Sequence, residues 1–382
     1  KTSKVPYADL LERALFQRFS VQRPLPRLWS FPGTRAGALV LTHATPEQTR
    51  AALGYADFGR KRGGSATVFV AADRLNPTQA TLLHQSRADI AVLWVRGHKR
   101  PAITRSVGIG ALEPFSQELT LAEQRELLLE ALPSKLEEPQ VVRTEGSVWA
   151  LDWSTTFEHL NHARFKLDSS FGPSADEEFG YLFGTGFPYY PLDRRGLPMP
   201  LLEAPYVLHE GSLTRERLRS FLGNSQAYFH QSLTVSLPAH TMRTSPSAGA
   251  LLALREAHEL AAQHEHWVAS LEELLAFLSA RRKSVLTSQW SEMTRRLTIS
   301  VNLLGAPSRT VDQGVFPGVS FPRTWQGEDV DRVVLDGTPF PTRKLRTTGP
   351  SLDYLIDVGP GRHTLSVYYK LPQQEGVLSE ED

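Results

Sequence analysis

One short segment places polar side chains directly after an apolar run. Residues 38–41 read Ala-Leu-Val-Leu and lead into Thr42 and His43. Parallel α/β proteins place their chemistry at the carboxyl ends of their strands. The next position, where a carboxylate would be useful, holds Ala44. The segment therefore supports two hypotheses: an active site, or the outline of one that has lost its chemistry.

The elements that must position these residues alternate along the chain. Apolar runs at 37–43, 65–72 and 89–95 predict strands, and the segments between them predict helices. Asn76 before Pro77, and Thr120 three residues before Glu123, are typical helix starts. The alternation predicts a parallel sheet with right-handed crossovers. Its repeated order favours a barrel of the TIM kind, and a doubly wound open sheet is the alternative.

The second half of the chain changes character twice. Residues 172–223 are rich in Gly, Pro and aromatic residues, which predicts a functional insertion. "AGALLALREAHELAAQHE" and "WVASLEELLAFLSARRKSV" are expected to be helices that close the domain. From about residue 286, apolar and polar residues alternate at period 2, which predicts an antiparallel β-sandwich. The expected domains are an N-terminal helix and connector (1–36), a barrel (37–285), a sandwich (286–372) and an acidic tail (373–382).

Composition excludes several classes of function. The 382 residues carry a formal net charge of +1, which gives no electrostatic case for a nucleic-acid partner. With no cysteine, the chain has no disulfide, thiolate nucleophile or cysteine-based zinc site. No apolar run approaches the roughly 20 residues that span a bilayer. The sequence begins at Lys1, so we expect a trimmed start, and the absence of cysteine fits an exported bacterial protein without disulfides.

Residues 36–285 resemble the polysaccharide deacetylases with the NodB-type fold. Leu41 to Pro46 aligns with the family motif Thr-Phe-Asp-Asp-Gly-Pro, and Ala66 to Val70 matches the strand that often follows it. "DIAVLWVRGH" aligns with the His-x-x-x-His motif, with Trp94 in place of the first His and His98 as the second. The resemblance implies a distorted (β/α)7-type barrel, here followed by an accessory β-sandwich. It also implies removal of acetyl groups from N-acetylated sugars by a divalent metal held by one Asp and two His.

The resemblance also assigns roles to single positions. His43 falls where the catalytic base would be, and Arg143 falls beside that base in the third motif. Asp168 lies on the strand of the fourth motif. In the fifth motif Pro238 takes the place of the catalytic acid, with His240 two residues on. The candidate catalytic residues are therefore His43, Arg143, Asp168 and His240.

The substitutions remove the expected metal ligands. Ala44 falls where the metal-binding Asp would be, and it has no lone pair to offer; the Trp94 indole is a donor only. Zinc needs about three protein ligands, so His98 alone does not hold it. We predict no bound metal and no other cofactor. As an alternative, His43 and His98 with Asp168 or Glu145 form a legitimate zinc set, which with Arg143 would make an active de-N-acetylase or esterase.

Sugar recognition can survive the loss of catalysis. Aromatic faces stack on the C–H groups of sugar rings, and the candidate substrate-binding residues are Trp94, Trp149, Trp153, Phe187, Tyr189 and Tyr190. The competing interpretation is that these rings pack the insertion onto the barrel. The leading hypothesis is an exported protein of the bacterial cell envelope that binds or organises a polysaccharide or peptidoglycan-type glycan without cleaving it. A third possibility is a structural or assembly protein with a filled pocket.

Overall fold

The computed structural model describes most of the chain and divides it into two compact units. The described residues are 5–45, 49–94, 120–132, 139–144, 153–173, 180–209, 214–220, 232–237, 248–308, 314–347 and 353–371. The first unit comprises residues 1–10, 36–276 and 308–312. The second comprises residues 11–35, 277–307 and 313–382. The expected acidic tail lies outside the described residues.

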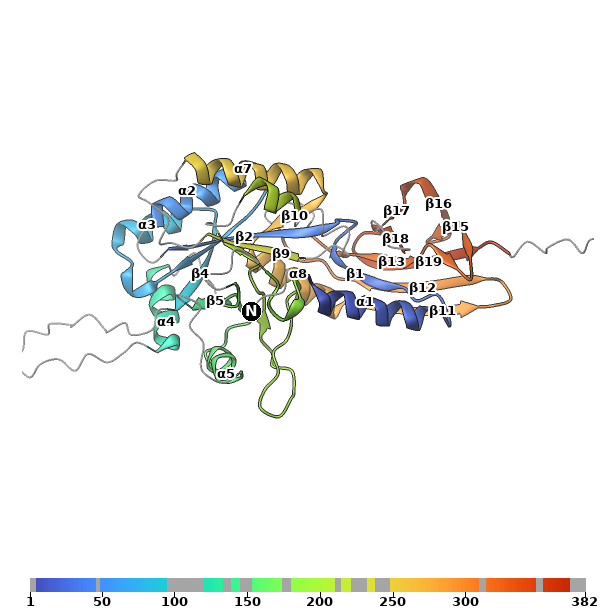
Figure 1. The fold of residues 1–382 in the computed structure, drawn as a ribbon, viewed down its shortest axis with the longest axis horizontal. Helices are drawn as coiled ribbons and strands as arrows, with labels where there is room; N and C mark the ends of the chain where they lie inside the picture. Colours follow the sequence, from blue (N-terminus) through green and yellow to red (C-terminus); the bar gives the residue numbers. More distant parts are fainter. Residues whose placement is uncertain are drawn as a thin grey trace, which may run out of the picture. The chain divides into compact units, whose positions relative to one another are not determined.

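A parallel sheet forms the centre of the first unit (Figure 1). Its nine strands run in the order β7-β6-β5-β4-β3-β2-β9-β8, with β10 also paired to β2, and the pairings are parallel. The strands are β2 (Gly37–Thr45), β3 (Thr67–Val70), β4 (Asp89–Trp94), β5 (Val141–Thr144), β6 (Leu167–Asp168), β7 (Leu202–Glu203), β8 (Leu208–His209), β9 (Ser232–Leu237) and β10 (His266–Ala269).

The helices of this unit share one face of the sheet. They are α2 (Thr49–Arg60), α3 (Pro77–Gln85), α4 (Leu121–Ala131), α5 (Thr155–His162) and α7 (Ala248–Gln263). Their buried apolar residues form one cluster, the helix-side cluster, with strand residues such as Leu41, Val68, Val92 and Val142. A doubly wound sheet would carry helices on both faces. The parallel sheet with one helix layer fits a distorted barrel.

Local signals in the sequence position two of these helices as expected. The Asn76 side chain accepts a hydrogen bond from the Gln79 N–H at 2.9 Å, and Pro77 opens α3. The Thr120 hydroxyl accepts from the Glu123 N–H at 3.3 Å, and a Glu123 carboxylate oxygen accepts from the Thr120 N–H at 2.8 Å. The two predicted capping signals are confirmed.

Two expectations about secondary structure are wrong. The segment that begins at Trp267 was expected to be helical throughout, but His266–Ala269 is strand β10 and only Leu271–Lys283 is helix α8. Strand pairing with β2 decides this, because residues 266–269 align with residues 37–40 in a buried parallel ladder. The expected irregular insertion also contributes β7 and β8 to the sheet.

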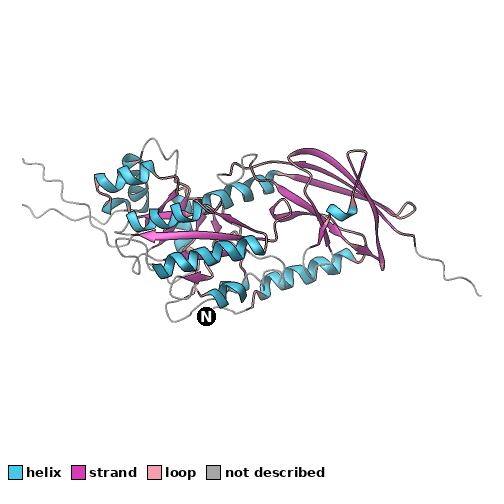
Figure 2. Ribbon diagram, turned by 90° about the horizontal axis from the view of Figure 1, so that it is seen from above, coloured by secondary structure: helices cyan, strands magenta, loops and turns pink. Residues whose placement is uncertain are grey.

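Antiparallel strands dominate the second unit (Figure 2). One sheet has the order β1-β13-β18-β17, and the other has the order β11-β12-β19-β15-β14 with β16 paired to β15. These strands are β1 (Arg27–Pro32), β11 (Val285–Ser291), β12 (Arg296–Leu303), β13 (Pro317–Pro322), β14 (Thr324–Trp325), β15 (Glu328–Leu335), β16 (Thr338–Phe340), β17 (Arg346–Thr347), β18 (Asp353–Ile356) and β19 (Gly361–Tyr369).

The two antiparallel sheets contribute to a single apolar cluster. Ile299 and Leu365 come from one sheet, and Val319, Phe321 and Ile356 come from the other. Strand β1 belongs to the segment that was expected to be a connector. Helix α1 (Tyr7–Ser20) precedes it. Among the described residues, no helix is long and apolar enough to cross a membrane.

Candidate functional site

Arg143 is the charged residue at the centre of the inner face, the sheet face opposite the helix-side cluster. It lies on β5, and its exposed fraction is only 4%. Its Nε donates to the Ser169 carbonyl oxygen at 2.6 Å, its Nη2 donates to the Ser169 hydroxyl at 2.8 Å, and its Nη1 donates to the Thr42 hydroxyl at 3.1 Å. The guanidinium carbon lies 4.4 Å from the centre of the Phe69 ring. These three acceptors are neutral oxygens, and the Tyr206 ring also lies beside the cation, at 5.2 Å.

Burial lowers the pKa of Arg143, but the side chain keeps its charge. Burial lowers the pKa of Arg143 to about 10, while Tyr206, Asp168 and Glu203 act in the opposite direction. The side chain is therefore still a cation at neutral pH. Because it needs a nearby negative charge in a poorly hydrated interior, the two buried carboxyls are its electrostatic counterpart.

His43 lies on the opposite face of β2 from Thr42. Successive strand residues point to opposite faces, and Thr42 is the residue that bonds Arg143. The His43 ring stacks on Tyr55 of α2, with ring centres 5.5 Å apart. Burial, then His258 and then Arg143, lower the pKa of His43 to about 3. The structure thus places the expected base in the helix layer as a neutral, fully buried imidazole.

His258 of α7 lies along the same face of α2 as His43. Its Nε2 is 3.0 Å from the position that a Cβ on Gly59 would occupy, one helical turn after Tyr55. Burial and then Arg62 lower the pKa of His258 to about 4. No described residue forms a hydrogen bond with either ring nitrogen of His43 or with Nε2 of His258. Two neutral imidazoles are therefore packed within the helix layer.

Ala44 and Trp94 do not share a face of the sheet. Ala44 is in register with Phe69, whose ring contacts Arg143, so Ala44 belongs to the inner face. Trp94 is half-buried and packs against the helix-side cluster. The residue in register with Arg143 is Leu93. Trp94 thus lies away from the inner face, where it was expected to occupy the emptied metal site.

Asp168 pairs with a residue that the sequence did not single out. In register, Asp168 lies between Val142 of β5 and Glu203 of β7, so the two carboxyls lie on one face. Both are fully buried, and no described donor forms a hydrogen bond with Asp168 Oδ2 or Glu203 Oε2. Burial raises the pKa of Asp168 to about 6. Burial and then the Asp168 charge raise the pKa of Glu203 well above its usual range. One proton shared between the carboxyls satisfies both.

Hydrogen bonds from the loops hold this acid pair in place. The Ser170 hydroxyl donates to Asp168 Oδ1 at 2.5 Å and accepts from the Thr144 N–H at 2.8 Å. Glu203 Oε1 accepts from the Phe171 N–H at 3.1 Å. The backbones of Tyr189 and Glu203 exchange hydrogen bonds of 2.9 and 2.8 Å. These bonds therefore tie β6 and the loop after it to β7 and Tyr189, which both belong to the insertion.

The predicted aromatic residues are split between surface and interior. Trp153 is 57% exposed and Tyr190 is 36% exposed, whereas Phe187 and Tyr189 are half-buried. Phe183, a further aromatic residue of the insertion, is 58% exposed and adopts φ 56°. A left-handed backbone is costly for a bulky residue. Phe183 is singled out by this backbone conformation together with its exposed ring, and neither feature can be predicted from the sequence. His98, Trp149, His240, Glu145 and Pro238 lie outside the described residues.

The described residues do not fit the metal that the family resemblance implies. Within the described ranges, no group of three or more His, Asp or Glu side chains could hold a metal ion. Ala44 has no donor atom, and His43 lies in the helix layer. Asp168 Oδ1 accepts a hydrogen bond from the Ser170 hydroxyl, and Asp168 lies in register beside Glu203. No step of chemistry is therefore assigned to a metal at this site.

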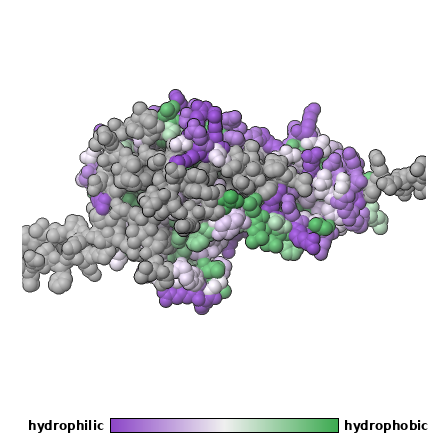
Figure 3. Space-filling model, in the orientation of Figure 1, coloured by the Kyte–Doolittle hydropathy of each residue, from purple (hydrophilic) through white to green (hydrophobic). Residues whose placement is uncertain are grey.

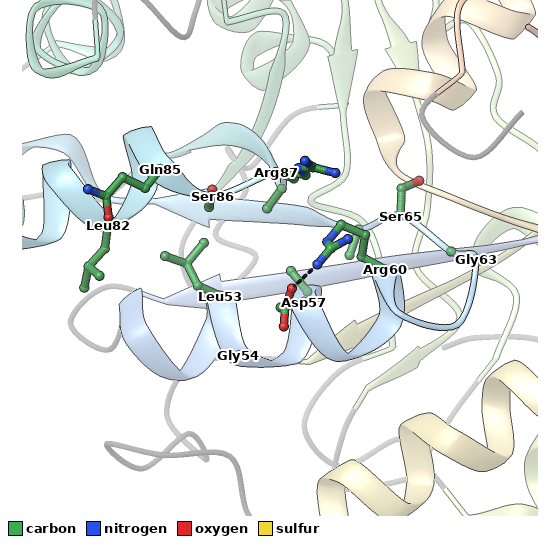
Figure 4. A pocket seen from close by; sticks show the side chains of 14 residues that line it. Leu53, Gly54, Asp57, Arg60, Gly63, Ser65, Leu82, Gln85, Ser86 and Arg87 are labelled. Atoms are coloured by element: carbon green, nitrogen blue, oxygen red, sulfur yellow. Dashed lines mark hydrogen bonds and ion pairs between the residues drawn. The ribbon is translucent and has the colours of Figure 1, made fainter. Parts of the chain in front are cut away.

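A groove of about 880 Å³ opens at the other end of the strands (Figure 4). It is lined by α2, the turn at Gly63–Ser65, the end of α3 and the short segment that leads from α3 into β4. Asp57 and Arg60 form an ion pair of 2.6 Å at its wall. The groove lies at the amino ends of β3 and β4, so it is separate from the strand ends that carry Thr42 and Arg143.

Comparison with known proteins finds likeness in structure alone. No protein-family model and no curated protein matches the sequence. A family 4 carbohydrate esterase from Streptomyces lividans matches 62% of this chain and 92% of its own, at 10% identity and TM-score 0.32. The peptidoglycan deacetylase PdaC from Bacillus subtilis, in a mutant form, matches 63% and 90%, at 13% identity and TM-score 0.32.

A third solved structure is a mutant of a CE4-family pseudoenzyme. It matches 64% of this chain and 70% of its own, at 11% identity and TM-score 0.35. The matches are CE4-type deacetylases. They belong to the family that the sequence resembles, but such low identities and TM-scores carry no argument about the chemistry of this chain. That chemistry depends on the side chains described above.

Proposed function

We propose that this chain is a deacetylase-like protein of the bacterial cell envelope that binds a polysaccharide or peptidoglycan-type glycan without hydrolysing it. The observation that carries the proposal is the inner face at the strand ends, where Thr42, Ala44 and Arg143 stand. None of these side chains can take a proton from water at neutral pH. Amide hydrolysis needs an activated water and a stabilised oxyanion.

The hydrogen bonds of Arg143 support the same conclusion. A guanidinium beside a catalytic base would be expected to bond that base. Here Ser169 and Thr42 take three of its N–H groups, and the three acceptors are neutral oxygens. Arg143 therefore acts as a structural tie between β5, β2 and the loop after β6.

Exposed aromatic rings provide the contact with a sugar. Phe183 is held from within the first unit by Phe171, at 5.6 Å between ring centres, and by Tyr189, at 6.1 Å. Trp153 and Tyr190 add further exposed rings. A rigid ring with a solvent-exposed face is suited to stack on the C–H groups of a pyranose. The second unit serves as an accessory β-sandwich, supported by the single apolar cluster of its two sheets.

One observation favours an active enzyme as the second candidate. The pKa of Asp168 is raised to about 6, which lies in the range of a general base. In that alternative, Asp168 and Arg143 would act with His98 and a zinc ion in a rearranged site. The fully buried carboxyl pair argues against it, because substrate would have to displace Glu203 or the loop at Ser170.

Binding and turnover can be separated experimentally. Oligomers of N-acetylglucosamine and soluble peptidoglycan fragments are titrated into the protein by calorimetry, and acetate release is measured with zinc present. We expect binding without acetate release. Phe183→Ala should weaken binding at least about tenfold, whereas Met293→Ala, a 92% exposed residue of the second unit, should not. Acetate release that Asp168→Asn abolishes would favour the active enzyme, and absence of glycan binding would overturn the proposal.

A further inference from the structure

The six-stranded sheet of the second unit has one covered face and one open face. Leu297, Ile299 and Val367 point into the apolar cluster between the two sheets of this unit. Because successive strand residues point to opposite faces, the residues that alternate with them point outward. Pairing sets these outward residues in rows across four strands: positions 285, 287, 289 and 291 of β11, 296, 298, 300 and 302 of β12, 362, 364, 366 and 368 of β19, and 332 and 334 of β15. We call this surface the arginine face.

The charged residues at the outward positions are all arginines. Arg296 and Arg332 lie in register on either side of Tyr368, and Arg362 lies at the opposite end of β19. All three arginines are exposed. The Arg332 guanidinium carbon lies 4.2 Å from the centre of the Tyr368 ring. The Arg296 guanidinium, and then that of Arg332, lower the pKa of the Tyr368 hydroxyl. The end of the face at Tyr368 therefore favours a negative charge.

Hydroxyl groups occupy the rows between the arginines. Thr298 lies in register with Ser366, and Ser300 lies in register with Thr364. These side chains both donate and accept hydrogen bonds. A hollow of about 290 Å³ opens at the end of the face that carries Arg362. Six residues separate the first row from the last, which is a span of about 20 Å along an antiparallel strand. The face is therefore long enough for an oligomer.

Two carboxylates border the arginine face without neutralising it. Asp336, at the edge of the hollow, pairs with His363 at 2.8 Å and accepts from the Thr364 N–H at 2.8 Å. Asp331 precedes Arg332 at the register shift in β15. Figure 3 shows mainly hydrophilic residues over β15 and β16. Three arginines against two bordering carboxylates leave the face with a positive excess.

We propose that the arginine face binds an acidic polysaccharide, with a sugar carboxylate held by Arg296 and Arg332 and a neighbouring sugar in the hollow at Arg362. Guanidinium groups match carboxylates with paired N–H donors, and the rows of hydroxyls suit the hydroxyls of the sugars. Single-stranded nucleic acid calls for open aromatic platforms, whereas Arg332 covers Tyr368, the one aromatic residue at the outward positions. The proposal does not depend on the glycan binding proposed for the first unit.

The test compares two forms of one polymer on the full chain by calorimetry. Polygalacturonate carries a carboxylate on each sugar, and its methyl ester has the same sugars without the charge. We expect polygalacturonate to bind, and the ester to bind at least about tenfold more weakly because it cannot form charged hydrogen bonds. Equal affinity for the two polymers overturns the role of charge, and absence of binding to polygalacturonate overturns the proposal.

A pair of substitutions locates the site. Arg296→Gln with Arg332→Gln should weaken polygalacturonate binding at least about tenfold. The matched control is Arg215→Gln with Arg255→Gln, which removes two exposed arginines of the first unit and should leave the affinity unchanged. Unchanged binding after replacement of Arg296 and Arg332 overturns the proposal. Phe183→Ala should also leave this binding unchanged, which separates it from the site proposed in the first unit.

Two further measurements test the choice of ligand. Single-stranded DNA that binds more tightly than polygalacturonate at the same salt concentration overturns the choice of a polysaccharide. Residues 375–382 contribute four acidic side chains, and we expect polygalacturonate to bind the wild-type chain with these residues in place. Binding that appears only after they are changed to Gln and Asn would assign the face to the chain's own carboxyl end and overturn the external ligand.

Discussion

Asp168 and Glu203 lie side by side in register across β6 and β7, and both carboxyls are fully buried. Two adjacent buried carboxylates repel each other, and neither Asp168 Oδ2 nor Glu203 Oε2 has a described hydrogen-bond donor, so we infer that one proton is retained between them. The pair then carries a single negative charge, which balances the buried Arg143 cation. Through Ser170 and the Phe171 N–H, this neutral set links the strand ends to the insertion.

Replacing Glu203 with glutamine should change how stability depends on pH. The pKa of each carboxyl is raised by folding, so this part of the stability is present below pH 4 and is lost as pH rises through the folded pKa values. Glu203→Gln keeps the acceptor for Phe171 and supplies an N–H donor to Asp168 without a titrating proton. Urea unfolding at pH 5 and pH 8 should show a smaller loss of stability in the variant. Each proton accounts for a slope of at most about 1.4 kcal/mol per pH unit. The exposed Glu216→Gln is the control, and an unchanged slope in Glu203→Gln would contradict the shared proton.

Acid should destabilise the protein through the buried imidazoles. The pKa values of His43, His258 and His266 are lowered by burial to about 3, 4 and 4. Their contribution to stability is therefore present above the unfolded pKa of about 6.5 and is lost as pH falls below it. His43→Leu should reduce the loss of stability between pH 6.5 and pH 4.5, by up to about 1.4 kcal/mol per pH unit. Titration of the His43 ring by NMR near pH 6.5 in the wild type would be incompatible with this burial.

Gly64 provides the space for His258. A Cβ at residue 64 would lie 2.5 Å from His258 Cε1 and 2.7 Å from Val268 Cγ1. Gly64→Ala should therefore destabilise the protein by about 1–3 kcal/mol, the usual cost of overpacking. Gly305→Ala, whose added Cβ would meet only a carbonyl oxygen at 3.8 Å, should cost much less. Chemical denaturation compares the two. His258→Ala should relieve the clash, so the two changes are expected to be non-additive, and strict additivity would show that the imidazole is not the obstacle.

Restoring the family pattern by two substitutions should not restore hydrolysis. Ala44→Asp adds a carboxylate to the inner face, but Trp94→His adds an imidazole on the side of the helix-side cluster. The two new ligands would then lie on opposite faces of the sheet. We expect the double variant to release no acetate from an N-acetylglucosamine oligomer with zinc present. Ala44→Asn with Trp94→Phe controls for folding. Zinc-dependent turnover by the double variant would place both residues in one pocket.

The sequence predicts the strands more readily than the faces of the strands. Residues 38–41 are all buried, because both faces of β2 are covered. A strand of this kind shows no alternation between apolar and polar residues, so the sequence cannot tell whether His43 or Thr42 points to the inner face. The resemblance to the deacetylases placed His43 at a reaction centre, and the packing on Tyr55 places it in the helix layer.

Short strands and long-range pairing explain what else the sequence did not predict. Glu203 lies in a strand of two residues, within a segment rich in Gly and Pro, and only its pairing with β6 brings it to Asp168. Strand β10 was expected to be helical because its four residues, 266–269, are too few to show a strand pattern and stand just before a segment of strong helix formers that begins at Leu271. The capping signals at Asn76 and Thr120, which act within one helical turn, were predicted correctly.

A calorimetric titration of zinc into the wild-type protein tests the central claim most directly. The account holds that the strand ends offer no set of ligands for a catalytic ion, because Ala44 has no donor and Asp168 is bound to Glu203. It predicts no stoichiometric binding at micromolar zinc. One tightly bound zinc per chain, lost when Asp168 is replaced by asparagine, would contradict it and make hydrolysis the favoured function.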